Sequence, residues 1–377
     1  MIDVKHFFDD LVNNEINFFS GVPDSLLKDL CAYITDNSTE SNHIISANEG
    51  GAISLAMGYH LATRKTPLVY MQNSGLGNTV NPLLSLADSC VYSIPMLLVI
   101  GWRGEPGVKD EPQHYKQGLV TEEILNNLQI PYYILPENYS DSKVILSKVL
   151  KKINDTSAPC ALLIRKNTFK PYGLKKSLTT NFDMNREDAV KKIINNIQLD
   201  DIVVATTGKT SRELFEYRKE LEQTHERDFL TVGGMGHANQ IALGIALHIK
   251  DRQIYCLDGD GAVLMHLGSV GIIGDLSPRN FKHIIINNGS HDSVGGQPTV
   301  GFDVDFQKVF NGLNYKSCFK ISNSNEFTSV FNEFKKSKGP VMLEILVNKG
   351  ARKNLGRPTI SPKENKLNFM KSIDSYE

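Results

Sequence analysis

Two short motifs, each following a run of apolar residues, carry the polar side chains with the clearest chemistry in this chain. Gly259-Asp260-Gly261 follows the run 253–257, and Asn287-Asn288-Gly289 follows the run 281–286. If both runs are buried strands of a parallel sheet, the motifs lie at its carboxyl edge, where open α/β sheets bind ligands. Carboxylate and amide oxygens are ligands that Mg²⁺ prefers, and glycines let a polyphosphate approach the backbone. The spacing therefore predicts a site for a metal and a diphosphate.

Taken alone, Gly-Asp-Gly is as consistent with an ordinary turn as with a ligand site. Together with Asn-Asn-Gly after a second strand, it resembles the thiamine-diphosphate-binding signature of the thiamine-dependent 2-keto acid decarboxylases. The resemblance implies that Asp260, the Asn288 side chain and the Ser290 backbone carbonyl hold Mg²⁺, and that the metal holds the diphosphate. It also places Gly259 and Gly261 beside the cofactor.

Enzymes of this class need a carboxylate against the aminopyrimidine ring of the cofactor, and Glu49 fits that position by its context. It follows a strand pattern and begins a small-residue helix, in the sequence Ala47-Asn48-Glu49-Gly50-Gly51-Ala52. The resemblance implies that Glu49 shares a proton with the ring and thereby activates the cofactor. The alternative is that Glu49 is only an acid at a helix N-terminus, where the macrodipole favours it.

Two further segments are candidates for contact with the cofactor. In Gly233-Gly234-Met235-Gly236, the resemblance makes Met235 the bulky residue that bends the cofactor, with Gly234 beside it. A buried core methionine is the alternative. Gly208-Lys209-Thr210-Ser211 lies at a predicted strand-to-helix turn, where a helix N-terminus can bind diphosphate. The upstream glycine that a P-loop requires is missing here.

The loops narrow the resemblance to the phosphonopyruvate and sulfopyruvate decarboxylases. Segments 21–25, 71–78 and 288–299 are similar to this pair, and segment 101–114 is similar to the phosphonopyruvate branch. The resemblance covers essentially the whole chain. It implies decarboxylation of 3-phosphonopyruvate to phosphonoacetaldehyde and CO₂ in phosphonate biosynthesis, with thiamine diphosphate and Mg²⁺ as cofactors.

Three alternatives stay open. A sulfopyruvate decarboxylase would take an isosteric anion, and segment 101–114 is the only feature that argues against it. A carboligase that joins two keto acids would share the cofactor site. A noncatalytic thiamine-binding subunit would not need Glu49, Asp260 and Asn288 together. A Rossmann dehydrogenase is not expected, because no G-x-G-x-x-G follows the first predicted strand.

A substrate that carries a carboxylate and a phosphonate requires positive charge in the site. Arginine suits a planar fork onto phosphonate oxygens, and lysine supplies a point charge. Five cations lie on predicted loops or helix starts near strand ends: Arg103, Lys109, Lys116, Lys209 and Arg212. We expect some of them to contact the substrate, Arg103 first and Lys109 near it, and the others to be solvated surface charges.

Three residues are candidates for handling the proton that replaces CO₂. Asp24 and His114 match positions where this family places an acid and a histidine, and His291 lies beside the metal motif, where it is also a candidate substrate contact. A histidine titrates near working pH, which suits acid–base chemistry. Otherwise Asp24 would be a helix cap, and His114 an exposed loop histidine.

Strand and helix patterns alternate around these residues along the whole chain. This alternation predicts an α/β fold with two doubly wound parallel-sheet domains. They are of the thiamine-diphosphate-binding type by resemblance, with no middle domain. We predict a pyrimidine-binding domain over 1–168, a polar linker over 169–184 and a diphosphate- and Mg-binding domain over 185–377. A polar loop is predicted over 104–118.

The composition excludes several other classes. A chain of 377 residues with 41% hydrophobic and 22% charged residues fits two globular domains. The net charge of −1 argues against a nucleic-acid partner, and no apolar run approaches the roughly 20 residues of a membrane span. Five isolated cysteines fit reduced thiols in a cytoplasmic protein. The resemblance further implies a homodimer or a dimer of dimers, with active sites between subunits.

Overall fold

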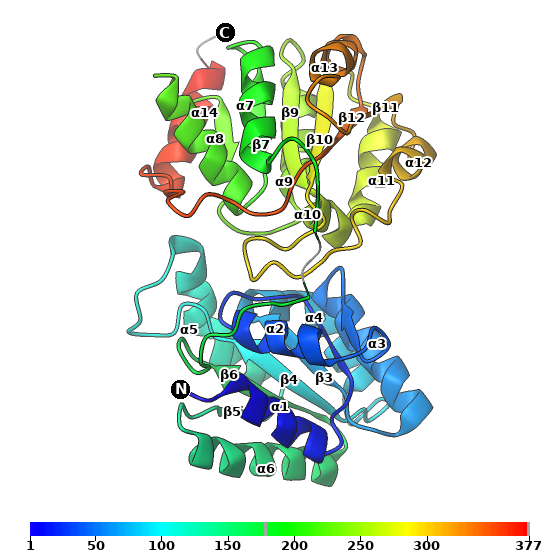
Figure 1. The fold of residues 1–377 in the computed structure, drawn as a ribbon, viewed down its shortest axis with the longest axis vertical. Helices are drawn as coiled ribbons and strands as arrows, with labels where there is room; N and C mark the ends of the chain where they lie inside the picture. The colour runs from blue at the N-terminus through cyan, green and yellow to red at the C-terminus, as the bar shows by residue number, and fades with distance from the viewer. Residues whose placement is uncertain (177–178, 375–377) are drawn as a thin grey trace. The chain divides into compact units, whose positions relative to one another are not determined.

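The computed structural model describes residues 1–176 and 179–374. The chain divides into two compact units, 1–177 and 178–377, and the division falls within the segment 169–184 that we predict to be a linker. Each unit is built on a six-stranded parallel sheet covered by helices (Figure 1). The predicted fold class, two doubly wound parallel sheets without a middle domain, is confirmed.

In each unit, successive strands are connected by one or more helices. The first unit contains α1 (Val4–Asn13), β1 (Phe19–Gly21), α2 (Lys28–Asn37), β2 (His43–Ile45), α3 (Glu49–Thr63), β3 (Leu68–Gln72), η1 (Asn73–Gly75), α4 (Leu76–Pro82), η2 (Leu83–Ala87), β4 (Met96–Gly101), α5 (Pro112–Asn127), β5 (Tyr132–Ile134), α6 (Tyr139–Thr156) and β6 (Pro159–Ile164). The second contains α7 (Arg186–Asn196), β7 (Ile202–Ala205), α8 (Lys209–Glu220), β8 (Asp228–Leu230), α9 (Ala238–His248), β9 (Ile254–Gly259), α10 (Asp260–Met265), α11 (Leu267–Leu276), β10 (Phe281–Asn287), α12 (Phe306–Gly312), β11 (Ser317–Ile321), α13 (Phe327–Lys336), β12 (Val341–Leu346) and α14 (Pro362–Asp374).

The two sheets share one topology. Their strand orders are β2-β1-β3-β4-β6-β5 and β11-β12-β10-β9-β7-β8. Counted from the first strand of each unit, both orders are 2-1-3-4-6-5. The direction of winding changes between β1 and β3 in the first sheet, and between β7 and β9 in the second. Such switch points leave a crevice at the carboxyl ends of the strands, which is where this architecture binds ligands.

The central strands are continuous apolar runs because both of their faces are buried. In β4, Leu97 and Val99 pack into one core with α1, α2 and α6. Leu98 and Ile100, which alternate with them, pack into a second core with α3, α4 and α5. The second sheet likewise separates two apolar clusters. This layering fixes the strand ends, and therefore the positions of the polar residues that follow them.

One predicted boundary is wrong and one helix was not predicted, and both differences affect the site. The loop predicted over 104–118 ends early, because α5 begins at Pro112, and proline is favourable at the first position of a helix. His114 therefore lies in the first turn of a helix. The helix α10, which begins directly at Asp260, was not expected from the sequence. In the described part of the chain, no helix is long and apolar enough to cross a membrane.

The packing of α11 allows a direct test of the second unit. A Cβ atom on Gly274 would overlap the backbone carbonyl oxygen of Leu313, whereas a Cβ on Gly268 would meet nothing within 4 Å. We expect Gly274→Ala to lower the free energy of unfolding by roughly 1–3 kcal/mol, because the backbone must move, although alanine is the better helix former. Gly268→Ala should leave stability unchanged or slightly raised. Thermal unfolding followed by far-UV circular dichroism measures both, and equal effects would contradict the packing.

Candidate active site

The second unit brings the two predicted metal-binding side chains together. In the register of β9 and β10, Gly259 lies opposite Ile286, so Asp260 and Asn288 follow at the same edge of the sheet. Both residues are buried, and the Asn288 backbone N–H donates to Asp260 Oδ1 at 3.4 Å. Burial raises the pKa of Asp260 to about 6, although the Thr299 hydroxyl and backbone amides, which donate to its carboxylate, pull it down. A divalent cation here would offset the cost of burying this carboxylate.

The oxygen ligands around Asp260 fit Mg²⁺. The Asn288 side-chain oxygen accepts from the Ser290 backbone N–H at 3.1 Å, which leaves its second lone pair for a cation. Ser290 is held by a β-bridge to Pro298, and its buried hydroxyl has no hydrogen-bond partner among the described residues. Carboxylate, amide and carbonyl oxygens form the hard donor set that Mg²⁺ prefers. The residues present therefore suit the predicted metal.

The turn from β7 to α8 supplies the segment predicted to bind diphosphate. The ammonium group of Lys209 is half-buried and forms no hydrogen bond or ion pair within the described chain, and burial lowers its pKa. Thr210 and Ser211 are buried behind it. The Ser211 hydroxyl donates to the Thr206 carbonyl at 2.8 Å, so only the backbone of Ser211 is left for a ligand.

Met235 lies between two glycines with positive φ, Gly234 at +65° and Gly236 at +90°. Its side chain is half-buried and belongs to none of the apolar core clusters. The alternative of a core methionine is therefore not supported by its packing. The side chain of Met235 is therefore partly exposed and apolar, and it is available for contact with a cofactor.

In the first unit, Glu49 is the first residue of α3 and is only 6% exposed. Its Oε2 accepts a hydrogen bond from Asn78 Nδ2 at 2.7 Å. The capping of α3 is done by Asn48, whose side chain accepts from the Gly51 backbone N–H, so the Glu49 carboxylate is not needed as a cap. A side chain at Gly75 would overlap that carboxylate. Asn78 and Gly75 were not singled out from the sequence, although both lie in a segment that carries the family resemblance.

Asp24 follows β1 and is fully buried. Its Oδ2 accepts from the backbone N–H groups of Leu26 and Leu27, at 2.9 and 3.3 Å, whereas its Oδ1 has no partner among the described residues. Burial raises the pKa of Asp24 to about 6, although backbone amides and the Arg103 guanidinium pull it down. Since α2 begins only at Lys28, Asp24 stabilises the preceding turn and is not the cap of that helix.

Arg103 is held by the protein itself. Its guanidinium forms a bidentate pair with Asp110, in which Nε donates at 2.7 Å, and it also donates to the Ser25 hydroxyl at 2.6 Å. Burial alone would raise the pKa of Asp110, but Arg103 and two backbone amides hold it below its usual range. Asp110 was missed in the sequence because nothing there distinguishes it from a surface acid.

The other predicted substrate and proton-handling residues are less closely gathered. Lys109 and Lys116 are exposed, and His114 is half-buried on α5. Arg212 donates to two backbone carbonyls of the C-terminal segment, those of Leu355 and Gly356. His291 lies against Gly261 of the metal motif, and burial lowers its pKa to about 4. His291 is therefore neutral at physiological pH.

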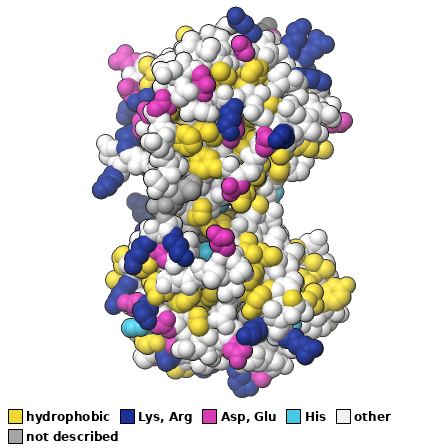
Figure 2. Space-filling model, turned by 45° about the vertical axis from the view of Figure 1, so that its right-hand side comes forward, with side chains coloured by type: hydrophobic (Ala, Val, Ile, Leu, Met, Phe, Trp, Pro, Cys, Tyr) yellow, Lys and Arg dark blue, Asp and Glu magenta, His cyan; other side chains and the backbone are white. Residues whose placement is uncertain are grey.

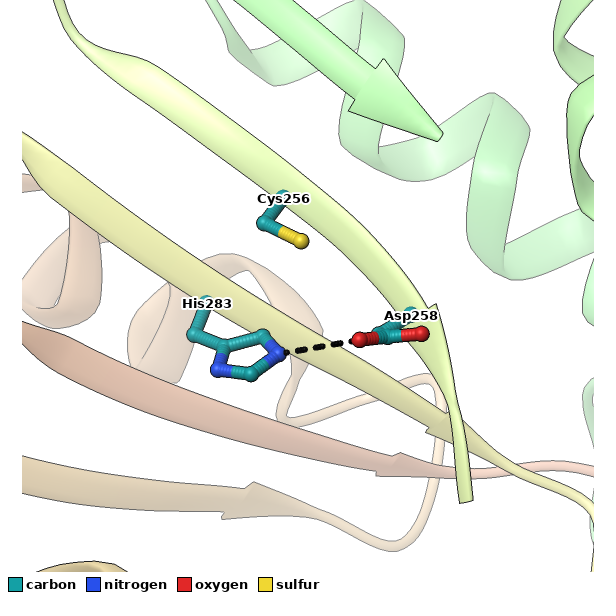
Figure 3. Close-up of side chains that lie close together, drawn as sticks. All are labelled: Cys256, Asp258 and His283. Atoms are coloured by element: carbon teal, nitrogen blue, oxygen red, sulfur yellow. Dashed lines mark hydrogen bonds and ion pairs between the residues drawn. The ribbon is translucent and has the colours of Figure 1, made fainter. Parts of the chain in front are cut away.

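A cluster of polar side chains that the sequence did not reveal lies on the two strands that lead to Asp260 and Asn288 (Figure 3). Cys256 and Asp258 on β9 and His283 on β10 are fully buried and point toward one another. Asp258 Oδ2 accepts from Asn239 Nδ2 at 3.2 Å and pairs with His283 Nε2 at 3.4 Å, while His283 Nδ1 faces the Tyr315 hydroxyl at 3.2 Å. Burial raises the pKa of Cys256 well above its ordinary value, so the thiol stays neutral. These bonds fix the end of the strand that carries Asp260.

Comparison with known families agrees with this arrangement. Residues 4–126 match the family described as "Thiamine pyrophosphate enzyme, N-terminal TPP binding domain". Residues 206–345 match "Thiamine pyrophosphate enzyme, C-terminal TPP binding domain". The fold and the two sites thus define an enzyme that uses thiamine diphosphate.

Curated relatives show which type of thiamine-diphosphate enzyme the chain resembles. Phosphonopyruvate decarboxylase of Streptomyces viridochromogenes is 30% identical over 361 residues, which cover 92% of this chain and 88% of the relative. The enzyme of the same name from Streptomyces hygroscopicus is 30% identical, covering 97% and 92%. Sulfopyruvate decarboxylase of Methanosarcina acetivorans is 25% identical, covering 95% and 94%. The chain belongs to the thiamine-diphosphate-dependent decarboxylases of the phosphonopyruvate and sulfopyruvate type, and it is a carboxy-lyase.

Because Asp24 is buried, we predict that the difference in stability between the wild type and Asp24→Asn depends on pH. Its raised pKa means that the native state keeps the proton between about pH 4 and 6, whereas the unfolded chain loses it. The free energy of unfolding therefore falls as the pH rises from about 4 to 6. Above pH 6 the full cost of burying the charged carboxylate is reached. We expect Asp24→Asn to be more stable than the wild type above pH 6, by up to about 3 kcal/mol, since one pKa unit is worth about 1.4 kcal/mol. The gain should vanish near pH 4.

Urea unfolding followed by tryptophan fluorescence measures this difference, because the single tryptophan, Trp102, is buried in the first unit. Asp155→Asn is the control, since Asp155 is an exposed residue on α6. A gain for Asp24→Asn that does not change with pH would contradict the burial argument.

Proposed function

We propose that this chain converts 3-phosphonopyruvate to phosphonoacetaldehyde and CO₂ in phosphonate biosynthesis, with thiamine diphosphate and Mg²⁺. The observation that carries the proposal is 30% identity to two phosphonopyruvate decarboxylases over more than nine-tenths of the chain, compared with 25% to a sulfopyruvate decarboxylase of full length. Sulfopyruvate decarboxylation is the second candidate, because that relative also covers nearly the whole chain.

The chain's own residues would bind and orient the cofactor. When bound, thiamine diphosphate supplies the electron sink for the loss of CO₂. Glu49 would hold the aminopyrimidine ring, and the hydrogen bond from Asn78 keeps the Glu49 carboxylate in place. Asp260, the Asn288 side chain and the Ser290 carbonyl would hold Mg²⁺.

The diphosphate would lie at the start of α8. The ammonium group of Lys209 and the backbone amides of Gly208, Thr210 and Ser211 are the donors we assign to it. A half-buried cation that forms no hydrogen bond or close ion pair within the described chain gains much from an anionic ligand, because burial has already removed part of its hydration. Met235, with Gly234 beside it, would support the body of the cofactor.

Asp24 is the acid that we propose to supply the proton that replaces CO₂. A buried carboxyl group with a pKa of about 6 is protonated in an appreciable fraction of molecules near neutral pH, which suits a general acid. His114 remains the alternative donor. His291, with a pKa of about 4, is too weakly basic to be a cationic donor and is assigned to substrate contact.

Arg103 and Lys109 are proposed to bind the phosphonate. A guanidinium has five N–H donors, and three of those of Arg103 are used by Asp110 and Ser25 within the described chain. Two donors are left for substrate oxygens, while Asp110 fixes the plane of the fork. Lys109 is exposed nearby in sequence and would add a mobile positive charge.

We also propose a homodimer or a dimer of dimers in which the Glu49 half of one subunit meets the Asp260 half of another. The exposed positions of α3 include Gly51, Ser54 and Gly58, which would allow close helix packing. Figure 2 shows hydrophobic side chains at the surface of both units. A cytoplasmic location is proposed because the five cysteines are free thiols.

The substrate assignment can be tested by CO₂ release from 3-phosphonopyruvate, sulfopyruvate and pyruvate, with thiamine diphosphate and Mg²⁺ present. We expect 3-phosphonopyruvate to be preferred. Glu49→Gln should lower kcat by roughly 10²–10⁴-fold, because the amide cannot share the proton. Glu123→Gln, an exposed change on α5, is the control and should keep full activity. A preference for sulfopyruvate would overturn the assignment of the substrate. Formation of a condensed product would indicate a carboligase.

A further inference from the structure

One carboxylate oxygen in the second unit receives hydrogen bonds from three segments of the chain. Asp292 Oδ2 accepts from Asn288 Nδ2 at 2.8 Å, from the Arg186 guanidinium at 2.9 Å and from the Gly350 backbone N–H at 2.8 Å. The three donors belong to the metal loop, to the start of α7 and to the segment after β12. Asp292 is therefore a junction between the proposed metal-binding amide and two elements that hold no ligand.

The contacts of Asn288 define which way its amide is turned. Its oxygen accepts from the Ser290 backbone N–H, and its nitrogen donates to Asp292. Turning the amide over would place its oxygen against the Asp292 carboxylate and its NH₂ group against the Ser290 N–H. Both hydrogen bonds would be replaced by repulsive contacts, so Asp292 and Ser290 together keep the amide oxygen in one direction.

Arg186 holds Asp292 in place from a buried position on α7. Its guanidinium forms a bidentate pair with Glu213, at 2.8 and 2.9 Å. It also donates to Asp292 and to the Gly350 carbonyl, at 2.9 and 3.2 Å. Asp292 is a second carboxylate beside Arg186, and it also interacts electrostatically with Lys209. Its distinctive contact is the one to Asn288.

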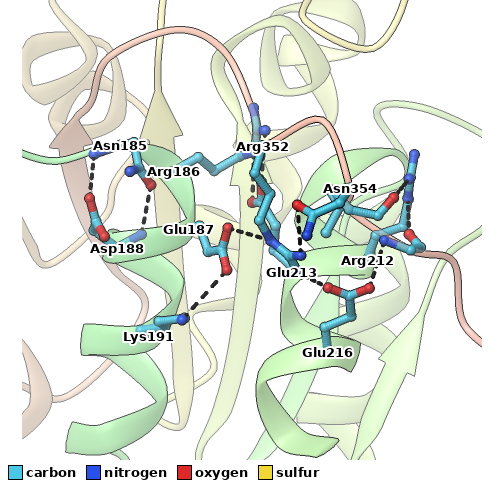
Figure 4. Close-up of polar contacts among 12 residues, drawn as sticks. Asn185, Arg186, Glu187, Asp188, Lys191, Arg212, Glu213, Glu216, Arg352 and Asn354 are labelled. Atoms are coloured by element: carbon cyan, nitrogen blue, oxygen red, sulfur yellow. Dashed lines mark hydrogen bonds and ion pairs between the residues drawn. The ribbon is translucent and has the colours of Figure 1, made fainter. Parts of the chain in front are cut away.

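The segment after β12 is itself fastened to α7 and α8. Arg352 pairs with Glu187 at 3.0 Å and with Glu216, and the Gly356 backbone N–H donates to Glu216 at 2.6 Å. Figure 4 shows Arg352 between these two glutamates. The Gly350 backbone that meets Asp292 is therefore anchored and does not depend on Asp292 for its position.

We propose that Asp292 is a positioning residue for the Asn288 amide, and that Arg186 and the Gly350 backbone fix its carboxylate for that task. This inference rests on the proposed function, because Asn288 is there the ligand of Mg²⁺. Residues that hydrogen-bond to metal ligands set the orientation of those ligands, and their loss typically weakens metal binding by about 10- to 100-fold.

The test measures Mn²⁺ binding in the presence of saturating thiamine diphosphate, with free Mn²⁺ detected by electron paramagnetic resonance. We expect Asp292→Ala to raise the Kd for Mn²⁺ by about 10- to 100-fold. Asp292→Asn keeps an oxygen that can accept from Asn288, so it should recover a large part of the affinity. Glu216→Gln is the matched control, since it loosens the same segment without touching Asn288, and its Kd should equal that of the wild type.

The melting temperature without ligands separates positioning from a purely structural role. A lower melting temperature of Asp292→Ala with an unchanged Kd would overturn the proposal. Equal losses in Asp292→Ala and Asp292→Asn would also overturn it, because they would show that the negative charge matters and not the hydrogen bond. A wild-type chain that binds no Mn²⁺ would overturn the metal site together with this inference, whereas Mn²⁺ binding without turnover of any keto acid would overturn only the proposed function.

Discussion

The constraint on which the structure depends is the burial of carboxylates at the carboxyl ends of its parallel strands. Asp24 follows β1 and Asp260 follows β9, and each strand borders the switch point of its sheet. Burial raises the pKa of both side chains to about 6. A buried charge is costly unless it is paired or binds a metal. Burial is therefore unfavourable for the charged form of both of these acids, and the surrounding strands and turns keep them there.

The two units share one topology but carry different polar residues at the ends of their strands. Both have the strand order 2-1-3-4-6-5, although their sequences show no evident repetition. Such topology requires only apolar runs of strand length, separated by amphipathic helices. The residues that follow the strands are free of that requirement, so one unit can carry Glu49 and Asp24 while the other carries Asp260 and Asn288.

The sequence predicted what depends on local pattern and missed what depends on distant contacts. The common edge of Asp260 and Asn288 follows from the apolar runs 253–257 and 281–286 and the residues after them. The Arg103–Asp110 pair, in contrast, could not be foreseen, because it requires knowledge of how the loop folds back. Arg186 and Asp292, which meet at this junction, are 106 positions apart in the sequence, and no periodicity relates them.

If Arg103 binds the substrate as we propose, the Arg103–Asp110 pair also limits how a phosphonate can be distinguished from a sulfonate. The two anions have the same shape, so the fork of Arg103, already fixed by Asp110, would bind both in the same way. They differ in charge, because a phosphonate can lose a second proton. In the proposed site, discrimination would therefore come from the net charge around the fork, to which Lys109 and the protonation state of Asp24 would contribute. A protonated Asp24 would favour the more highly charged anion, so in the proposed site substrate selection and proton delivery would depend on the same buried carboxyl group.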